Sequence, residues 1–112
     1  MNETLRLRRG HNFLPPKSVK VPALRSTDGI TLADQIVVLH YFSPSSDWWL
    51  TELDPATAEA FGFCCLNGDR DCAEWGYVSL PELERLYVPP WIIVERDCHW
   101  QPKSFREAVP WS

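Results

Sequence analysis

The stretch that decides the fold reads DWWLTELDP at 47–55, FGF at 61–63, EWGYVSLPELE at 74–84 and ERD at 95–97. Each segment joins aromatic or β-branched residues to carboxylates, and turn signals such as Asp54-Pro55 separate the segments. This pattern is typical of short strands. It shows no set of nucleophile, base and oxyanion donors, so the stretch indicates a fold more directly than it indicates a reaction.

Five strands are predicted around this stretch from period-two and β-branched character. They cover residues 36–42, 48–53, 60–66, 74–78 and 91–95, and residues 98–100 are a possible extension of the last one. Polar turns at 43–47, 54–57 and 67–71 separate the first four. The order predicts an α+β domain: a mainly antiparallel, four- to five-stranded curved sheet with one short helix packed on it.

The helix is predicted to begin at Ser79 and to run to Leu86. The Ser79 hydroxyl can accept from the amide of Glu82, which occupies the capping-box position, and Pro81 lies in the first turn. Leu80, Leu83 and Leu86 are expected to form its buried stripe. A further helical turn is predicted at 104–108, and residues 31–34 form either a helical turn or the lead into the first strand.

Charge divides the chain of 112 residues at residue 25. Residues 1–25 hold six of the eleven Lys and Arg residues and one acid, whereas residues 26–112 hold five bases and fourteen acids. We therefore predict a basic, Pro-containing arm over 1–25, either disordered or packed along a single α+β domain over 26–112. The alternative function of the arm is nucleic-acid binding through Arg6, Arg8, Arg9, Lys17 and Lys20.

Composition excludes several other classes of protein. No apolar run approaches the roughly 20 residues of a membrane helix, and no signal segment is present at the N-terminus, so we expect a soluble, cytoplasmic protein. Cys64, Cys65, Cys72 and Cys98 are expected to be reduced thiols rather than a disulfide framework.

Several separated motifs resemble one family. The runs 47–55, 61–62, 74–84 and 95–97, with Pro22-Ala23-Leu24-Arg25-Ser26-Thr27 before them, are similar to the domain of unknown function 2958, and the resemblance covers residues 22–102. It implies a small protein of bacterial plasmids, integrative elements or phages, and it implies no established activity. The chain departs from the family pattern at Cys64-Cys65, at the loop 67–72 and at Cys98-His99.

The candidate metal ligands and catalytic residues have unfavourable spacing. Adjacent Cys64 and Cys65 in a strand point to opposite faces and no Cys-x-x-Cys pair exists, so neither metal nor cofactor is expected. A small hydrolase or metal-dependent enzyme using Glu52, Asp54 and Glu95 is the alternative, because carboxylates on neighbouring strands can act as acid and base. Solvated strand ends and turn residues explain them more simply, and Asp54 is expected in a turn.

Two further side-chain roles are predicted to be structural. His40 is expected to be a packed, hydrogen-bonded side chain. Arg96 is expected to form a forked pair with a carboxylate such as Glu52, Glu74 or Asp97.

The remaining possibility is a partner-binding surface. The aromatic residues exceed what a small core can bury, and Trp and Tyr anchor protein interfaces. The predicted partner-binding residues are Trp48, Trp49, Glu52, Asp54, Glu74, Trp75, Glu82 and Glu84; Tyr77, Trp91 and Trp100 are further aromatic candidates. An acidic, aromatic surface suits a basic partner, so we expect a non-enzymatic protein-binding accessory factor, with an anti-CRISPR or anti-restriction inhibitor of a host nucleic-acid-binding defence complex as its specific form.

Overall fold

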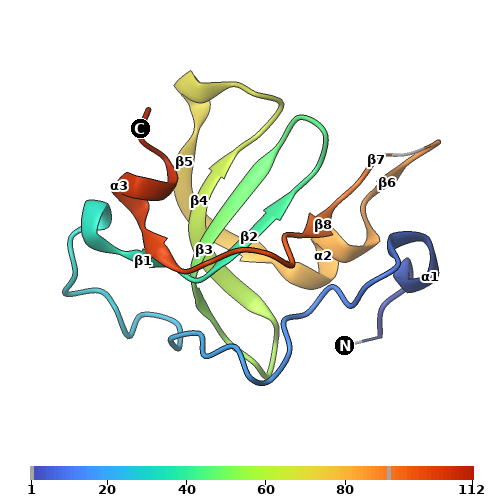
Figure 1. Ribbon diagram of the computed structural model, residues 1–112, viewed down its shortest axis with the longest axis horizontal. Coiled ribbons are helices and arrows are strands. Elements are labelled where there is room, and N and C mark those ends of the chain that lie inside the picture. Colours follow the sequence, from blue (N-terminus) through green and yellow to red (C-terminus); the bar gives the residue numbers. More distant parts are fainter. Residues whose placement is uncertain (1, 91) are drawn as a thin grey trace.

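A computed structural model describes residues 2–90 and 92–112 of the chain (Figure 1). The elements are α1 (Arg6–Arg9), η1 (Leu32–Asp34), β1 (Ile36–Val37), β2 (Leu39–Phe42), β3 (Asp47–Leu53), β4 (Glu59–Cys65), η2 (Arg70–Cys72), β5 (Glu74–Ser79), α2 (Leu80–Arg85), β6 (Tyr87–Val88), β7 (Ile92–Ile93), β8 (Glu95–Arg96), β9 (Lys103–Ser104) and α3 (Phe105–Ala108). No described helix is long and apolar enough to span a membrane.

A five-stranded antiparallel sheet in the order β5-β4-β3-β2-β8 forms the centre of the molecule. Its strands β2 to β5 form a meander, so each turn signal read from the sequence joins two neighbouring strands (Figure 1). Short helices pack around the sheet. The predicted α+β class and the predicted antiparallel sheet are thereby confirmed.

The fifth predicted strand, 91–95, was wrong in its extent. Ile92–Ile93 pairs with β6 in a separate hairpin, and only Glu95–Arg96 joins the sheet, beside β2. The Pro89-Pro90 turn returns the chain on itself here, where the sequence predicted only the end of a helix. The possible extension at 98–100 is a turn, and Trp91, predicted as an interface residue, lies outside the described residues.

Both faces of the sheet bury apolar side chains, so the molecule has two cores. The first core, which includes Tyr41, Trp48 and Leu50, is covered by α2 and by Phe13 of the N-terminal arm. The second, which includes Trp49 and Phe63, is covered by α3 and the residues that follow it. Cys64 and Cys65 contact different cores, as their alternation in a strand predicts.

Helix α2 confirms the predicted cap, because the Ser79 Oγ accepts from the Glu82 amide at 3.3 Å. Leu80 and Leu83 are buried in the first core. Leu86 was predicted to complete the stripe but is 42% exposed, because the helix ends at Arg85 and the chain turns into the β6–β7 hairpin. The predicted turn at 104–108 is helix α3, capped by the Ser104 hydroxyl, and residues 32–34 form η1.

The N-terminal arm packs across the first core. Phe13 is fully buried, its carbonyl accepts from the Tyr41 hydroxyl at 2.7 Å, and its ring packs in a tilted arrangement against that of Tyr41. Arg9 is buried as well, so it is not available to a phosphate, whereas Arg6, Arg8, Lys17 and Lys20 are exposed.

Candidate functional site

Four of the eight predicted partner-binding residues lie inside the protein. Trp48, Trp49, Glu52 and Glu84 are buried, the two carboxylates at 2% and 1% exposure. The exposure predicted for these four is wrong. Trp48, Trp49 and Glu52 lie on β3, the middle strand of a sheet that is covered on both faces, so alternation leaves neither tryptophan at the surface. Glu84 lies on α2 and is covered by the N-terminal arm.

The Glu52 carboxylate accepts hydrogen bonds from the backbone of a turn that is distant in sequence. Its carboxylate accepts from the amides of Arg25 at 2.8 Å and Thr27 at 3.0 Å, and from the Thr27 hydroxyl. Arg25 has a positive φ of 67°, so these bonds hold a backbone conformation that few non-glycine residues adopt. Glu52 is therefore a structural carboxylate.

The three carboxylates of the enzyme alternative are not brought together. Glu95 pairs with Phe42, at the opposite end of the sheet from Glu52. Asp54 accepts from the Ala56 amide at 2.9 Å and is the turn residue that the sequence predicts. Among residues 2–90 and 92–112, no three His, Cys, Asp or Glu side chains gather as metal ligands do.

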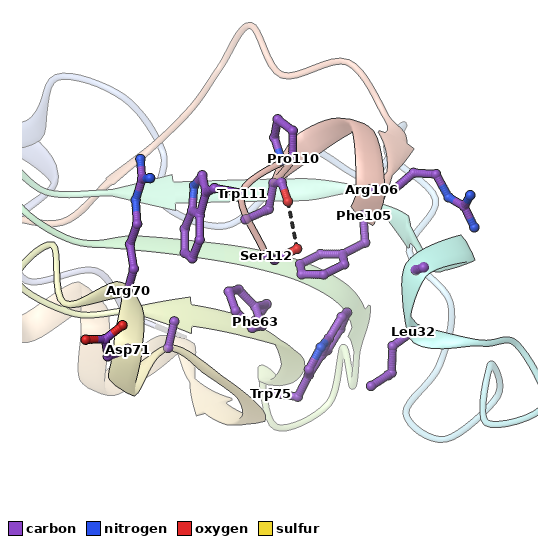
Figure 2. A pocket seen from close by; sticks show the side chains of 13 residues that line it. Leu32, Phe63, Arg70, Asp71, Trp75, Phe105, Arg106, Pro110, Trp111 and Ser112 are labelled. Atoms are coloured by element: carbon purple, nitrogen blue, oxygen red, sulfur yellow. Dashed lines mark hydrogen bonds between the residues drawn. The ribbon is translucent and has the colours of Figure 1, made fainter.

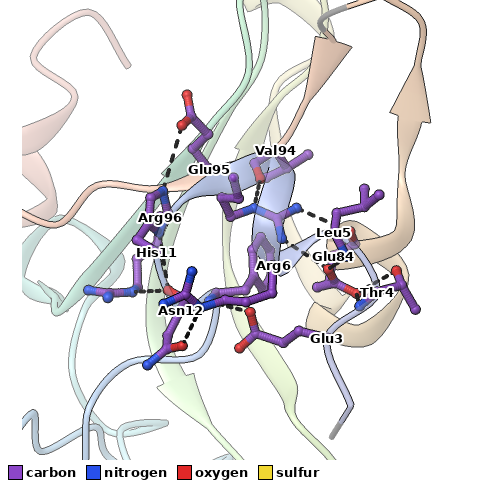
Figure 3. A network of polar contacts seen from close by, with 12 residues as sticks. Glu3, Thr4, Leu5, Arg6, His11, Asn12, Glu84, Val94, Glu95 and Arg96 are labelled. Atoms are coloured by element: carbon purple, nitrogen blue, oxygen red, sulfur yellow. Dashed lines mark hydrogen bonds and ion pairs between the residues drawn. The ribbon is translucent and has the colours of Figure 1, made fainter.

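Glu84 holds the N-terminal arm against α2 (Figure 3). Its carboxylate accepts from the amides of Thr4 and Leu5, both at 2.8 Å, and forms an ion pair with Arg9 at 2.9 Å. Arg9 also donates to the carbonyls of Val94 at 2.7 Å and Glu84 at 3.1 Å. Burial by itself raises the pKa of Glu84, but these hydrogen bonds outweigh it and lower the pKa to about 2.

The forked carboxylate pair predicted for Arg96 is absent from the described part of the chain. The Arg96 Nε donates instead to the carbonyl of Asn12 in the N-terminal arm, at 3.1 Å (Figure 3). The buried pair belongs to Arg9 and Glu84. The sequence does not reveal it, because 75 residues separate the two side chains.

Three of the other four predicted residues, Glu74, Trp75 and Glu82, lie at or near the outer edge of the sheet, around β5. Strand β5 pairs only with β4, so among the described residues its second edge is open. Tyr77 and Leu66 are 58% and 53% exposed there. We call β5, the loop before it and the nearby Glu82 the β5 surface; its side chains on both faces of the strand are Leu66, Asp69, Asp71, Glu74, Trp75, Tyr77 and Glu82.

A shallow groove of about 300 Å³ runs along the β5 surface, with Leu66, Glu74, Tyr77 and Glu82 in its lining. Glu74 and Glu82 are exposed, and Trp75 is half-buried. The rings of Trp75 and Tyr77 both pack on Phe61, at 5.7 and 5.2 Å between centroids. The structure therefore brings Glu74 and Glu82 to one groove, directs the neighbouring Trp75 to the opposite face of β5, and places Asp54 in the β3–β4 turn.

His40 is the titratable side chain whose surroundings the sequence could not define. Its Nε2 lies 2.8 Å from an Asp47 oxygen and its Nδ1 lies 3.0 Å from an Asp97 oxygen. Carboxylates only accept, so the doubly protonated ring can donate to both oxygens, whereas the neutral ring can donate to one. Burial lowers the pKa of His40, but the two carboxylates outweigh it and raise the pKa above 6.5. The expected packed, hydrogen-bonded histidine is confirmed, stacked between Trp49 and Phe42.

This histidine is expected to make stability depend on pH. Because its pKa is raised in the folded protein, the stabilisation is complete below the unfolded pKa of about 6.5 and is lost as pH rises through the folded pKa. Urea unfolding between pH 6 and 8.5 should show the free energy of unfolding falling with pH. The fall should be absent in His40→Gln; an equal fall in that variant would contradict this assignment.

The arrangement defines a small α+β protein with an open, acidic and aromatic sheet edge. The model of the family described as protein of unknown function (DUF2958) matches residues 22–106, and the chain belongs to that family. No curated protein and no solved structure matches it. The match covers the elements from η1 to β9, whereas α1 and the arm residues that bind Glu84 precede it.

Proposed function

We propose that this protein is a non-enzymatic, protein-binding accessory factor, and that the β5 surface binds an extended basic segment of its partner. The observation that carries the proposal is the combination of an open strand edge with a groove lined by Glu74, Glu82 and Tyr77. An extended peptide can add to such an edge through main-chain hydrogen bonds, while side-chain contacts select the sequence.

The charge of the β5 surface supports a basic partner. Asp69, Asp71, Glu74 and Glu82 are exposed along it. Arg70 lies between Asp69 and Asp71 in the sequence, but its guanidinium lies over the Trp111 ring and so points away from this edge. Spaced carboxylates of one sign accelerate the encounter with a basic segment and disfavour acidic ones.

The specific partner we propose is a host nucleic-acid-binding defence protein, as in anti-CRISPR or anti-restriction inhibition. The resemblance to proteins of mobile elements supports this context, and an acidic surface can occupy a site that otherwise holds phosphates. Trp75 and Tyr77 would anchor the contact through partly exposed aromatic area.

A charge-reversal experiment tests the proposal. We expect Glu74→Lys with Glu82→Lys to weaken binding at least tenfold, because both carboxylates flank the β5 groove. Asp28→Lys with Glu107→Lys is the matched control, since it makes the same change in charge at exposed positions on other elements. The tagged proteins would be compared by affinity capture from a bacterial host and by calorimetry on the captured partner.

A peptide probe separates strand addition from charge alone. A synthetic peptide of alternating lysine and valine should bind the wild type, and the same peptide N-methylated at alternate residues should not, because it cannot complete the β5 ladder. Equal binding of both peptides, or equal capture by the reversal variant and its control, would contradict the proposal.

A further inference from the structure

An aromatic cleft of about 750 Å³ lies on the second face of the sheet, between η1, η2 and α3. Phe63, Trp75, Phe105 and Trp111 line it, and Figure 2 shows the Trp111 ring on the side of Arg70 and the Trp75 ring beyond Phe63. Phe63 and Phe105 are buried, whereas Trp75 and Trp111 are half-buried and reach the opening. The volume lies within the range of small-molecule sites.

Arg70 gives this cleft a specific chemistry. Its guanidinium lies 4.6 Å from the centre of the Trp111 ring and runs alongside it (Figure 2). Within the described residues no carboxylate is in ion-pair distance of Arg70, and no protein acceptor takes a hydrogen bond from its side chain. The planar fork is thus held in place by the indole while its donors stay available to an anion.

The other charged groups of the lining, Arg106 and Asp71, influence which ligand charge the cleft favours. Arg106 extends away from the rings and pairs with Asp34 at 2.5 Å, so it adds a largely neutralised charge (Figure 2). Asp71 follows Arg70 in η2 and is exposed. Arg70 is therefore the one lining cation without a carboxylate partner in the described structure, and it stands beside an aromatic wall.

We propose that this cleft binds a mononucleotide, with the base stacked on the half-buried rings of Trp75 and Trp111 and the phosphate held by the Arg70 fork. Stacking on aromatic rings accepts any base because every base has a π-face. The acidic β5 surface beside the cleft disfavours a long phosphate chain, which selects a single nucleotide over a nucleic-acid strand. The cleft shares Trp75 with the proposed partner contact, but it depends on Arg70 and not on Glu74 or Glu82, so substitutions distinguish the two.

Calorimetry and the NMR signals of the tryptophan indoles test the site with three probes: adenosine 5′-monophosphate, adenosine and inorganic phosphate. The monophosphate should bind with one-to-one stoichiometry, at least tenfold more tightly than either fragment, and should shift two of the indole signals. Arg70→Gln should reduce its affinity to that of adenosine while leaving adenosine unchanged. Arg70→Lys should restore only part of the loss, because lysine lacks the planar fork.

Arg85→Gln is the matched control, because Arg85 is exposed on α2, outside the cleft lining, and should leave every affinity unchanged. The absence of binding at several millimolar monophosphate, or an unchanged affinity in Arg70→Gln, would overturn the proposal. Tighter, Arg70-dependent binding of a ten-residue oligodeoxyadenylate would overturn the assignment to a mononucleotide. The Glu74→Lys, Glu82→Lys variant should still bind the monophosphate in an Arg70-dependent way, so the two proposals can fail independently.

Discussion

Glu84→Gln is expected to lower the free energy of unfolding by about 3 to 5 kcal/mol, the usual cost of breaking a buried ion pair by removing one partner. The substitution leaves Arg9 buried and charged with no anion at 2.9 Å, and it weakens the bonds from the Thr4 and Leu5 amides. Urea denaturation measures the change. Because these contacts hold the arm to α2, the variant should also release the arm to proteases.

Glu82→Gln is the control for this substitution, since Glu82 lies on the same helix and is exposed. Its effect should stay within about 0.5 kcal/mol. Equal losses of stability in the two variants would show that the Arg9–Glu84 pair does not fasten the arm.

The same pair predicts lability toward acid. The pKa of Glu84 is lowered to about 2 from an ordinary 4.5, so its stabilisation is complete above 4.5 and is lost as pH falls toward 2. The wild type should therefore lose more stability than Glu84→Gln between pH 5 and pH 2. Parallel pH profiles would contradict the assigned shift.

Gly62→Ala is expected to cost about 3 kcal/mol or more, at or beyond the upper end of ordinary overpacking. A Cβ at this position would lie 2.1 Å from the Trp49 carbonyl oxygen and 2.7 Å from the Leu50 Cα. Both atoms belong to the backbone of β3, which is paired on both sides, so relief requires the strands to separate. Thermal and urea unfolding would measure the loss, and failure to fold is its extreme form.

Gly76 provides the matched control because it faces Gly62 across the β4–β5 pair. A Cβ at Gly76 meets no atom within 4 Å, so Gly76→Ala should be neutral or slightly stabilising. Comparable losses in the two variants would mean that strand propensity, and not the close approach of β3 to β4, governs the position.

Local signals gave most of the fold. The Ser79 hydroxyl and Pro81 define the start of α2, and both lie within its first turn or directly before it. The Asp54-Pro55 turn joins β3 and β4, two strands that their aromatic and β-branched residues predict. These predictions succeeded because the groups that interact are close in sequence. The strand at 91–95 failed because its pairing with β6 depends on a turn made by the prolines that precede it.

The candidate site was less predictable, because exposure depends on what covers each face. Composition suggested surplus aromatics, yet Trp48 and Trp49 are buried by segments remote in sequence, the arm on one face and the C-terminal residues on the other. The unbroken apolar run Trp48-Trp49-Leu50 was the available signal, since a strand buried on both faces loses its alternation. Arg70 and Trp111 carry no such signal, because 41 residues separate them.

The sequence by itself determined the kind of domain, the meander order, the capped helix and the division into a basic arm and an acidic body. Only the tertiary structure decided which charges are structural. In the sequence, Glu52 and Glu84 do not differ from surface acids. In the structure, Glu52 accepts from the amides of Arg25 and Thr27, and Glu84 accepts from the amides of Thr4 and Leu5. A buried carboxylate requires donors, and donors from distant segments come into place only when the chain folds; the acids left without them, Glu74 and Glu82, remain available to a partner.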